Sequence, residues 1–123
     1  GVAETGAGAF VRSSEVQDEK VKIDTSRIYY GNHNAWTRAG VIDGSKVLKA
    51  TTAWKDMHSK GIKKGSPEYD IYKHRAQKEM RAAIEKVAKS DPNRPYDLVG
   101  EVGAIVIKGS VVPDLTADVV SEL

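Results

Sequence analysis

The middle of the chain repeats apolar and polar positions with the period of a helix. From residue 46 to residue 60, apolar side chains recur every three or four positions, while lysines occupy the opposite side. Ser45 stands just before this stretch and can cap a helix, and Gly61 can end it. The pattern therefore predicts a first helix over residues 46–60.

A second and longer helical pattern covers residues 67–89. Its apolar positions form one stripe, made of Tyr69, Tyr72, Ala76, Met80, Ala83, Ile84 and Val87. Ser66 followed by Pro67 is a strong start signal for a helix. Because only about five residues connect the two helical stretches, they are expected to form an antiparallel helical hairpin over residues 46–89.

Short strands are predicted on both sides of the hairpin. The segments rich in β-branched and aromatic residues are 21–30 and 39–43 before it, and 96–99 and 104–107 after it. Thr116 can cap a last short helix that runs to residue 123. The order of elements predicts an α+β fold, with a small β-sheet body, a protruding antiparallel helical hairpin and a short C-terminal helix.

The length of 123 residues fits one domain with an extension. Residues 39–123 contain the hairpin and most predicted strands, and we assign them to the domain. Residues 1–38 form an N-terminal extension that is partly extended. Its first 20 residues are rich in Gly, Ala, Ser and Glu, which predicts a loose arm pinned at Phe10.

Charge is distributed unevenly along a chain whose formal net charge is only +2. Residues 45–89 hold twelve Lys and Arg against five Asp and Glu, so the hairpin is basic and the remainder acidic. Four lysines gather near the predicted tip, namely Lys55, Lys60, Lys63 and Lys64. They form either a solvated loop or a contact for an acidic partner, such as a protein surface or anionic lipid headgroups. No aromatic residues interleave with them, so no nucleic-acid partner is expected.

The sequence shows no group of residues typical of a catalytic site. The chain has no cysteine, its serines occupy cap or tail positions, and no glycine pattern matches a phosphate or dinucleotide loop. We therefore expect no enzyme activity, no cofactor and no metal. Tyr30 and Trp36 flank a polar turn, and these amphipathic rings are candidates for a partner interface. Trp54 lies on the helical stripe and is expected in the core.

The second half of the chain resembles the OmpH/Skp family of periplasmic chaperones. In that family a long helix leads into a strand of the Tyr-Asp-Leu-Val type, as Tyr96-Asp97-Leu98-Val99 does here. The next strand and the closing Asp-Leu-Thr helix also match in order, at residues 103–107 and 112–120. Upstream, residues 40–48 resemble the first strand and helix start. The resemblance covers about residues 39–123.

The resemblance implies a periplasmic protein, with its signal peptide removed, that acts in outer-membrane biogenesis. It also implies a homotrimer in which strands build a shared body and basic helical arms hold unfolded client proteins. The helices here would span only about 22 and 35 Å, so the arms would be short. The apolar strand residues Val99, Ile105, Val106 and Ile107 also favour strands covered by other subunits. The alternative is a small oligomeric scaffold or accessory subunit that binds one folded partner.

Overall fold

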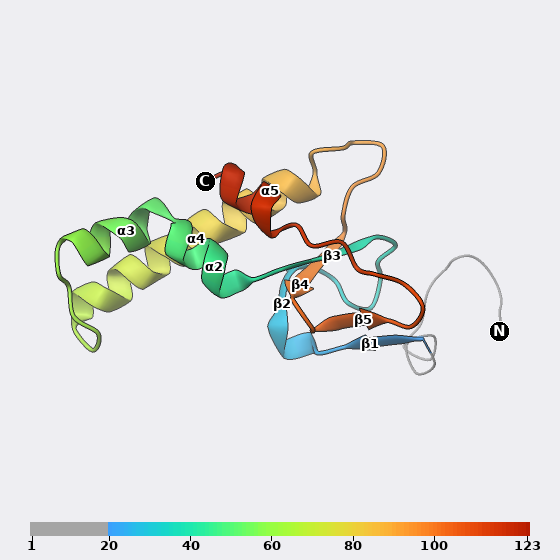
Figure 1. Ribbon diagram of the computed structural model, residues 1–123, viewed down its shortest axis with the longest axis horizontal. Coiled ribbons are helices and arrows are strands. Elements are labelled where there is room, and N and C mark those ends of the chain that lie inside the picture. The colour runs from blue at the N-terminus through green and yellow to red at the C-terminus, as the bar shows by residue number, and fades with distance from the viewer. Residues whose placement is uncertain (1–19) are drawn as a thin grey trace.

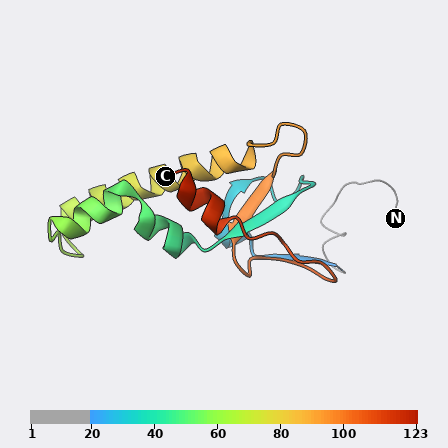
Figure 2. The same cartoon turned by 45° about the horizontal axis from the view of Figure 1, so that its top comes forward.

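The computed structural model describes residues 20–123, in which a helical hairpin extends from one side of a small group of strands (Figures 1 and 2). The short C-terminal helix lies beside the part of the hairpin nearest the strands (Figure 1). The predicted α+β fold is therefore confirmed. The predicted anchor at Phe10, like the rest of residues 1–19, falls outside the described residues.

Five short strands form what we call the β body. They are β1 (Val21–Ile23), β2 (Ile28–Gly31), β3 (Ala39–Ile42), β4 (Leu98–Glu101) and β5 (Ile105–Ile107). β4 lies at the centre of a three-stranded sheet, antiparallel to β2 and parallel to β3. β1 and β5 form a separate antiparallel pair. Because β1 and β2 come from the extension, its described part is hydrogen-bonded into the β body.

The strand predicted over residues 21–30 is interrupted by a short 3₁₀ turn, η1 (Thr25–Arg27). The carboxylate of Asp24 accepts hydrogen bonds from the backbone N–H of Ser26 at 3.1 Å and from its hydroxyl at 2.6 Å. It also pairs with Arg27 at 2.9 Å. These local bonds satisfy the backbone in a turn, which separates β1, paired with β5, from β2, paired with β4.

Four helices complete the described fold: α2 (Gly44–Ala50), α3 (Thr52–Ser59), α4 (Pro67–Ala88) and α5 (Thr116–Ser121). α4 starts as predicted, with Ser66 accepting from the N–H of Tyr69 at 3.1 Å. The predicted cap at Thr116 is wrong, because Thr116 is already helical. Its hydroxyl donates to Asp114 at 2.5 Å and accepts from the N–H of Asp43 at 2.9 Å.

The first helix of the hairpin differs from the prediction in two ways. It begins earlier, because Asp43 rather than Ser45 is the cap and accepts from the N–H of Lys46 at 3.1 Å. It also breaks at Thr51, whose ψ of 153° is extended. The buried Thr51 hydroxyl donates to the carbonyl of Leu48 at 2.7 Å and accepts from the N–H of Trp54 at 3.2 Å. One side chain thus ends α2 and caps α3.

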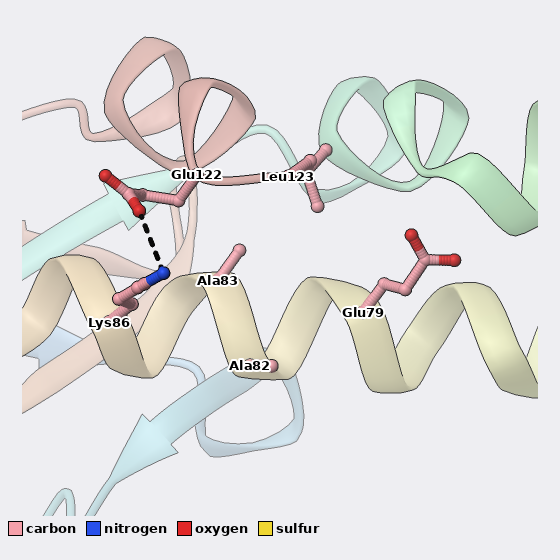
Figure 3. Close-up of a pocket in the computed structure, with 6 residues that line it drawn as sticks. All are labelled: Glu79, Ala82, Ala83, Lys86, Glu122 and Leu123. Atoms are coloured by element: carbon pink, nitrogen blue, oxygen red, sulfur yellow. Dashed lines mark ion pairs between the residues drawn. The ribbon is translucent and has the colours of Figure 1, made fainter.

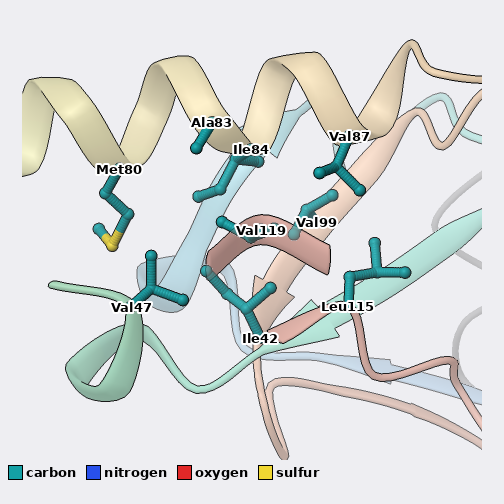
Figure 4. Close-up of a cluster of buried hydrophobic side chains, with 9 residues drawn as sticks. All are labelled: Ile42, Val47, Met80, Ala83, Ile84, Val87, Val99, Leu115 and Val119. Carbon is teal, nitrogen blue, oxygen red and sulfur yellow. The ribbon is translucent and has the colours of Figure 1, made fainter. Parts of the chain in front are cut away.

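The main hydrophobic core joins the hairpin to the β body (Figure 4). Its nine buried residues are Ile42, Val47, Met80, Ala83, Ile84, Val87, Val99, Leu115 and Val119. Complete burial of an aliphatic side chain of this size contributes roughly 1.5–3 kcal/mol. The base of the hairpin is therefore packed firmly against the strands and α5.

A second buried cluster lies within the β body and consists of Ala39, Val41, Leu98 and Ile105. Val99 is 0% exposed and Ile105 is 3% exposed within this single chain. Their apolar character is explained by intrachain packing and is no argument for contacts with other subunits. Val106, by contrast, is 51% exposed and faces solvent.

A carboxylate ties the start of the hairpin to the β body. Oε1 of Glu101 accepts from the hydroxyl of Tyr29 at 2.6 Å and from the N–H of Gly44 at 2.9 Å. A Cβ on Gly44 would lie 2.1 Å from that hydroxyl oxygen, so only glycine permits this close approach. Burial, followed by the bond to Glu101, raises the pKa of Tyr29.

The cap assignment is testable with neighbouring substitutions. Asp43→Ala removes the acceptor for the first turn of α2, and we expect it to lower the free energy of unfolding by about 1 kcal/mol. Ser45→Ala is the matched control and should change it by less than about 0.5 kcal/mol, since Ser45 is exposed and caps nothing. Urea unfolding followed by circular dichroism measures both. A larger loss from Ser45→Ala would show that the cap is misassigned.

The bond between Tyr29 and Glu101 should make stability depend on alkaline pH. Tyr29→Phe is expected to cost about 1–2 kcal/mol near neutral pH. Since the folded-state pKa of Tyr29 is raised, its stabilisation is complete below about pH 10, the ordinary tyrosine value, and is lost as pH rises through the folded-state pKa. Urea unfolding of both proteins across a pH series should show their difference shrinking at high pH. A difference that grows there would contradict this role.

Candidate partner-binding site on the helical hairpin

The hairpin outside the main core is formed by α3 and the first half of α4. Ala53 and Met57 of α3 are buried, as is Ala76 of α4. The chain turns at residues 60–66, where Gly61 adopts a φ of +65° that favours glycine. The exposed sides of both helices and this tip are the surfaces available to a partner.

Glu79 of α4 holds the broken helix in place. Its two carboxylate oxygens accept from the N–H groups of Thr52 and Ala53 at 3.0 and 2.8 Å. These N–H groups lie in the first turn of α3, where no carbonyl of the same helix can reach them and where the helix dipole favours an anion. In the sequence Glu79 is only one of the charged residues of the hairpin, although the Thr51-Thr52 pair within a helical pattern is a signal for a break.

Lys60 is engaged within the hairpin, unlike the other predicted tip lysines. Its Nζ donates to the hydroxyl of Tyr72 at 2.8 Å and lies 3.3 Å from a carboxylate oxygen of Asp56. The bond to Tyr72, followed by the bond to Asp56, raises the pKa of Lys60. Arg75 lies over the same tyrosine ring, 5.3 Å from its centre. Lys60 therefore joins α3 to α4.

Lys55, Lys63 and Lys64 are exposed and make no ion pair among residues 20–123. No acidic group of the hairpin forms an ion pair with these three lysines, and three of the five acidic groups have other partners. Asp56 pairs with Lys60, Glu79 caps α3, and Glu85 pairs with Lys89 at 2.7 Å. The remaining two, Glu68 and Asp70, lie in the first turn of α4, near its positive dipole end.

Tyr30 and Trp36 do not form one surface. Tyr30 is partly buried against the main core, whereas Trp36 is partly buried against the second cluster. The loop that carries Trp36 is held by Asp97, which accepts from the N–H groups of Thr37 and Arg38 at 2.9 and 2.8 Å. Both rings therefore have a packing role in the β body, away from the hairpin tip.

Trp54 is not the core residue that the sequence suggested. It is only partly buried, and the buried positions of α3 are Ala53 and Met57. Its ring lies 5.7 Å from that of His58 and 6.1 Å from that of Tyr69. Helical periodicity alone did not distinguish the buried side of α3 from its edge, because the break at Thr51 changes which residues continue the stripe.

A hollow of about 220 Å³ lies between α4 and α5 (Figure 3). Its lining residues are Glu79, Ala82, Ala83, Lys86, Glu122 and Leu123. Lys86 lies 3.5 Å from Glu122, and Glu79 is already bonded to α3. The charged groups of the hollow thus have partners within the chain, and they do not converge on a ligand.

A larger and shallow hollow of about 510 Å³ lies beside α5, lined in part by Lys46, Asp114 and Val120. Hydrogen bonds from Thr116 lower the pKa of the Asp114 carboxyl, so this acid serves the start of α5. Among residues 20–123, no three His, Asp or Glu side chains are close enough to hold a metal ion. Within the same range, no helix has the length and apolar character needed to cross a membrane.

A comparison with known proteins found no match: no protein-family model matches the chain, and neither does any curated protein or solved structure. The similarity to the OmpH/Skp family accordingly rests on the sequence motifs of residues 39–123. The candidate site is therefore defined by the physical properties of the hairpin, above all its exposed lysines.

The capping role of Glu79 is testable. Glu79→Ala leaves two N–H groups at the start of α3 without their carboxylate acceptor, and we expect a loss of about 1–3 kcal/mol in the free energy of unfolding. Lys78→Ala, one position away on the exposed side of α4, is the matched control and should change it by less than about 0.5 kcal/mol. Thermal and urea unfolding measure both. Equal effects of the two substitutions would refute the capping role.

Proposed function

We propose that this chain is a periplasmic chaperone-like protein of the OmpH/Skp type that binds client or partner proteins with a short basic helical arm and performs no catalysis. The observation that carries the proposal is the charge arrangement of the hairpin. Lys55, Lys63 and Lys64 are exposed and form no ion pair in the described chain, while most acidic groups of the hairpin are bonded internally. The family resemblance supports the same assignment.

The mechanism is electrostatic capture followed by weak apolar contact. A basic projection attracts an acidic segment and increases the rate of encounter. Each exposed ion pair contributes about 0–1 kcal/mol, so binding is reversible and tolerates varied sequences. α4 has 22 residues and spans about 33 Å, and α3 has only 8. An arm of this size holds a segment of a client rather than enclosing a whole unfolded chain.

The proposal includes a homo-oligomer, with a trimer as the family resemblance implies. Half-exposed Val106 supports an oligomer. This residue lies on the two-stranded β1–β5 pair, whose outer edges form no ladder with another described strand and can therefore pair with another subunit. The alternative of a scaffold for one folded partner at Tyr30 and Trp36 has less support, since these two rings pack in different clusters.

The test is suppression of aggregation of several unrelated unfolded proteins by the full chain. We expect Lys55→Glu/Lys63→Glu/Lys64→Glu to weaken this suppression several-fold at low salt, because the attraction becomes repulsion. Lys60 is left unchanged, since its substitution would also break the bonds to Tyr72 and Asp56. Light scattering at a series of protein ratios gives the measurement.

The matched control reverses the same amount of charge away from both the hairpin tip and the β1–β5 pair, by Lys46→Glu/Lys49→Glu/Arg94→Glu, all at exposed positions. This variant should suppress aggregation as the wild type does. Failure of the wild type to suppress the aggregation of any client would refute the chaperone function. Equal weakening by both variants would show that net charge, and not the position of the tip lysines, is responsible.

A further inference from the structure

The two sides of the hairpin differ in what covers their aromatic rings. On one side, two basic residues of the same chain contact Tyr72: Lys60 donates a hydrogen bond to its hydroxyl, and Arg75 lies over its ring. On the other side, Trp54, His58 and Tyr69 form a cluster that we call the Trp54 flank. In the described part of the chain, no Lys or Arg lies over the rings of this flank.

The Trp54 flank is a partly exposed aromatic cluster beside the buried interface of the hairpin. Trp54 and Tyr69 are partly buried and meet nearly edge to face, at an interplanar angle of 70°. His58 is exposed and stands one helical turn after Trp54 on the same side of α3. Contacts within the cluster limit the motion of the rings, so a partner that binds there loses little entropy in ordering them.

We infer that the Trp54 flank is an anchor site for an aromatic or large aliphatic side chain within an acidic, extended segment of a partner protein; this inference rests on the proposed function. Charge complementarity identifies the occupant, because the surrounding hairpin carries twelve basic and five mostly engaged acidic residues. Trp and Tyr are the residues that most often carry binding energy at protein interfaces. Exposed lysines attract the segment, and the flank selects its apolar side chain.

The experiment uses the full chain with Trp36→Phe, which leaves Trp54 as its single tryptophan. The probes are a short unstructured peptide rich in Asp and Glu that carries phenylalanines, and the same peptide with alanine at those positions. We expect the phenylalanine peptide to bind about tenfold tighter and to shift the Trp54 emission to shorter wavelength. Equal affinity of the two peptides, or tighter binding without a change in Trp54 emission, would overturn the inference.

Substitutions then separate the flank from the lysines. Trp54→Ala and Tyr69→Ala should each remove most of the preference for phenylalanine, while weak binding of both peptides remains. Ile71→Ala is the matched control, since Ile71 is 53% exposed on α4 but outside the flank, and it should keep the preference. Circular dichroism checks the folding of each variant, and the emission measurement needs no substitution in the flank.

The outcomes distinguish this inference from the proposed function. If Trp54→Ala keeps the preference while reversal of Lys55, Lys63 and Lys64 abolishes binding, the anchor site is wrong and the basic arm stands. If neither peptide binds and no client is protected, the proposed function fails, and the inference fails with it. If Trp54 emission shifts with phosphatidylglycerol vesicles but with neither peptide, the flank faces a lipid surface and the inference is overturned.

Discussion

The apolar stripe of α4 is the constraint on which the rest of the structure depends. Its N-terminal half contributes Ala76 to the contact with α3, and its C-terminal half contributes Ile84 and Val87 to the main core. A single continuous helix therefore belongs both to the arm and to the body. Because packed interiors resist small displacements, the direction of the arm is set by the core and not by a flexible joint. A surface presented on this arm is held in a fixed position relative to the β body.

The α2 and α3 helices are held in place by polar bonds of their backbone N–H groups and of Thr51. Thr51 interrupts the chain between α2 and α3, and Glu79 supplies the acceptors that the new helix start requires. At the opposite end of α2, Glu101 binds both the N–H of Gly44 and the hydroxyl of Tyr29. These carboxylates fix the two ends of the α2 segment, and each does so from a distant part of the sequence. Their charge serves the fold and is not available to a partner.

The sequence predicted the elements better than their joints. The start of α4 was correct because the Ser66-Pro67 signal is local. The break at Thr51 was missed, since α3 resumes a helical pattern immediately and the acceptor for its first turn, Glu79, lies 27 residues from Thr52. The role of Lys60 was missed for a similar reason. Periodicity shows which side of each helix is apolar, but not how two helices are aligned along their length, and this alignment brings Tyr72 to Lys60. Contacts between residues far apart in the sequence therefore limited the prediction of both the fold and the candidate site.

The distribution of bonded and unbonded charge links the fold to the proposed activity. A hairpin with as many free acidic as basic groups would present no net attraction to an acidic segment. Here the fold uses Asp56, Glu79 and Glu85 for its own contacts, so these three carboxylates do not pair with Lys55, Lys63 or Lys64. The same internal bonds cover Tyr72 and leave the Trp54 flank open. Structural needs on one side of the arm thus produce a chemically distinct surface on the other.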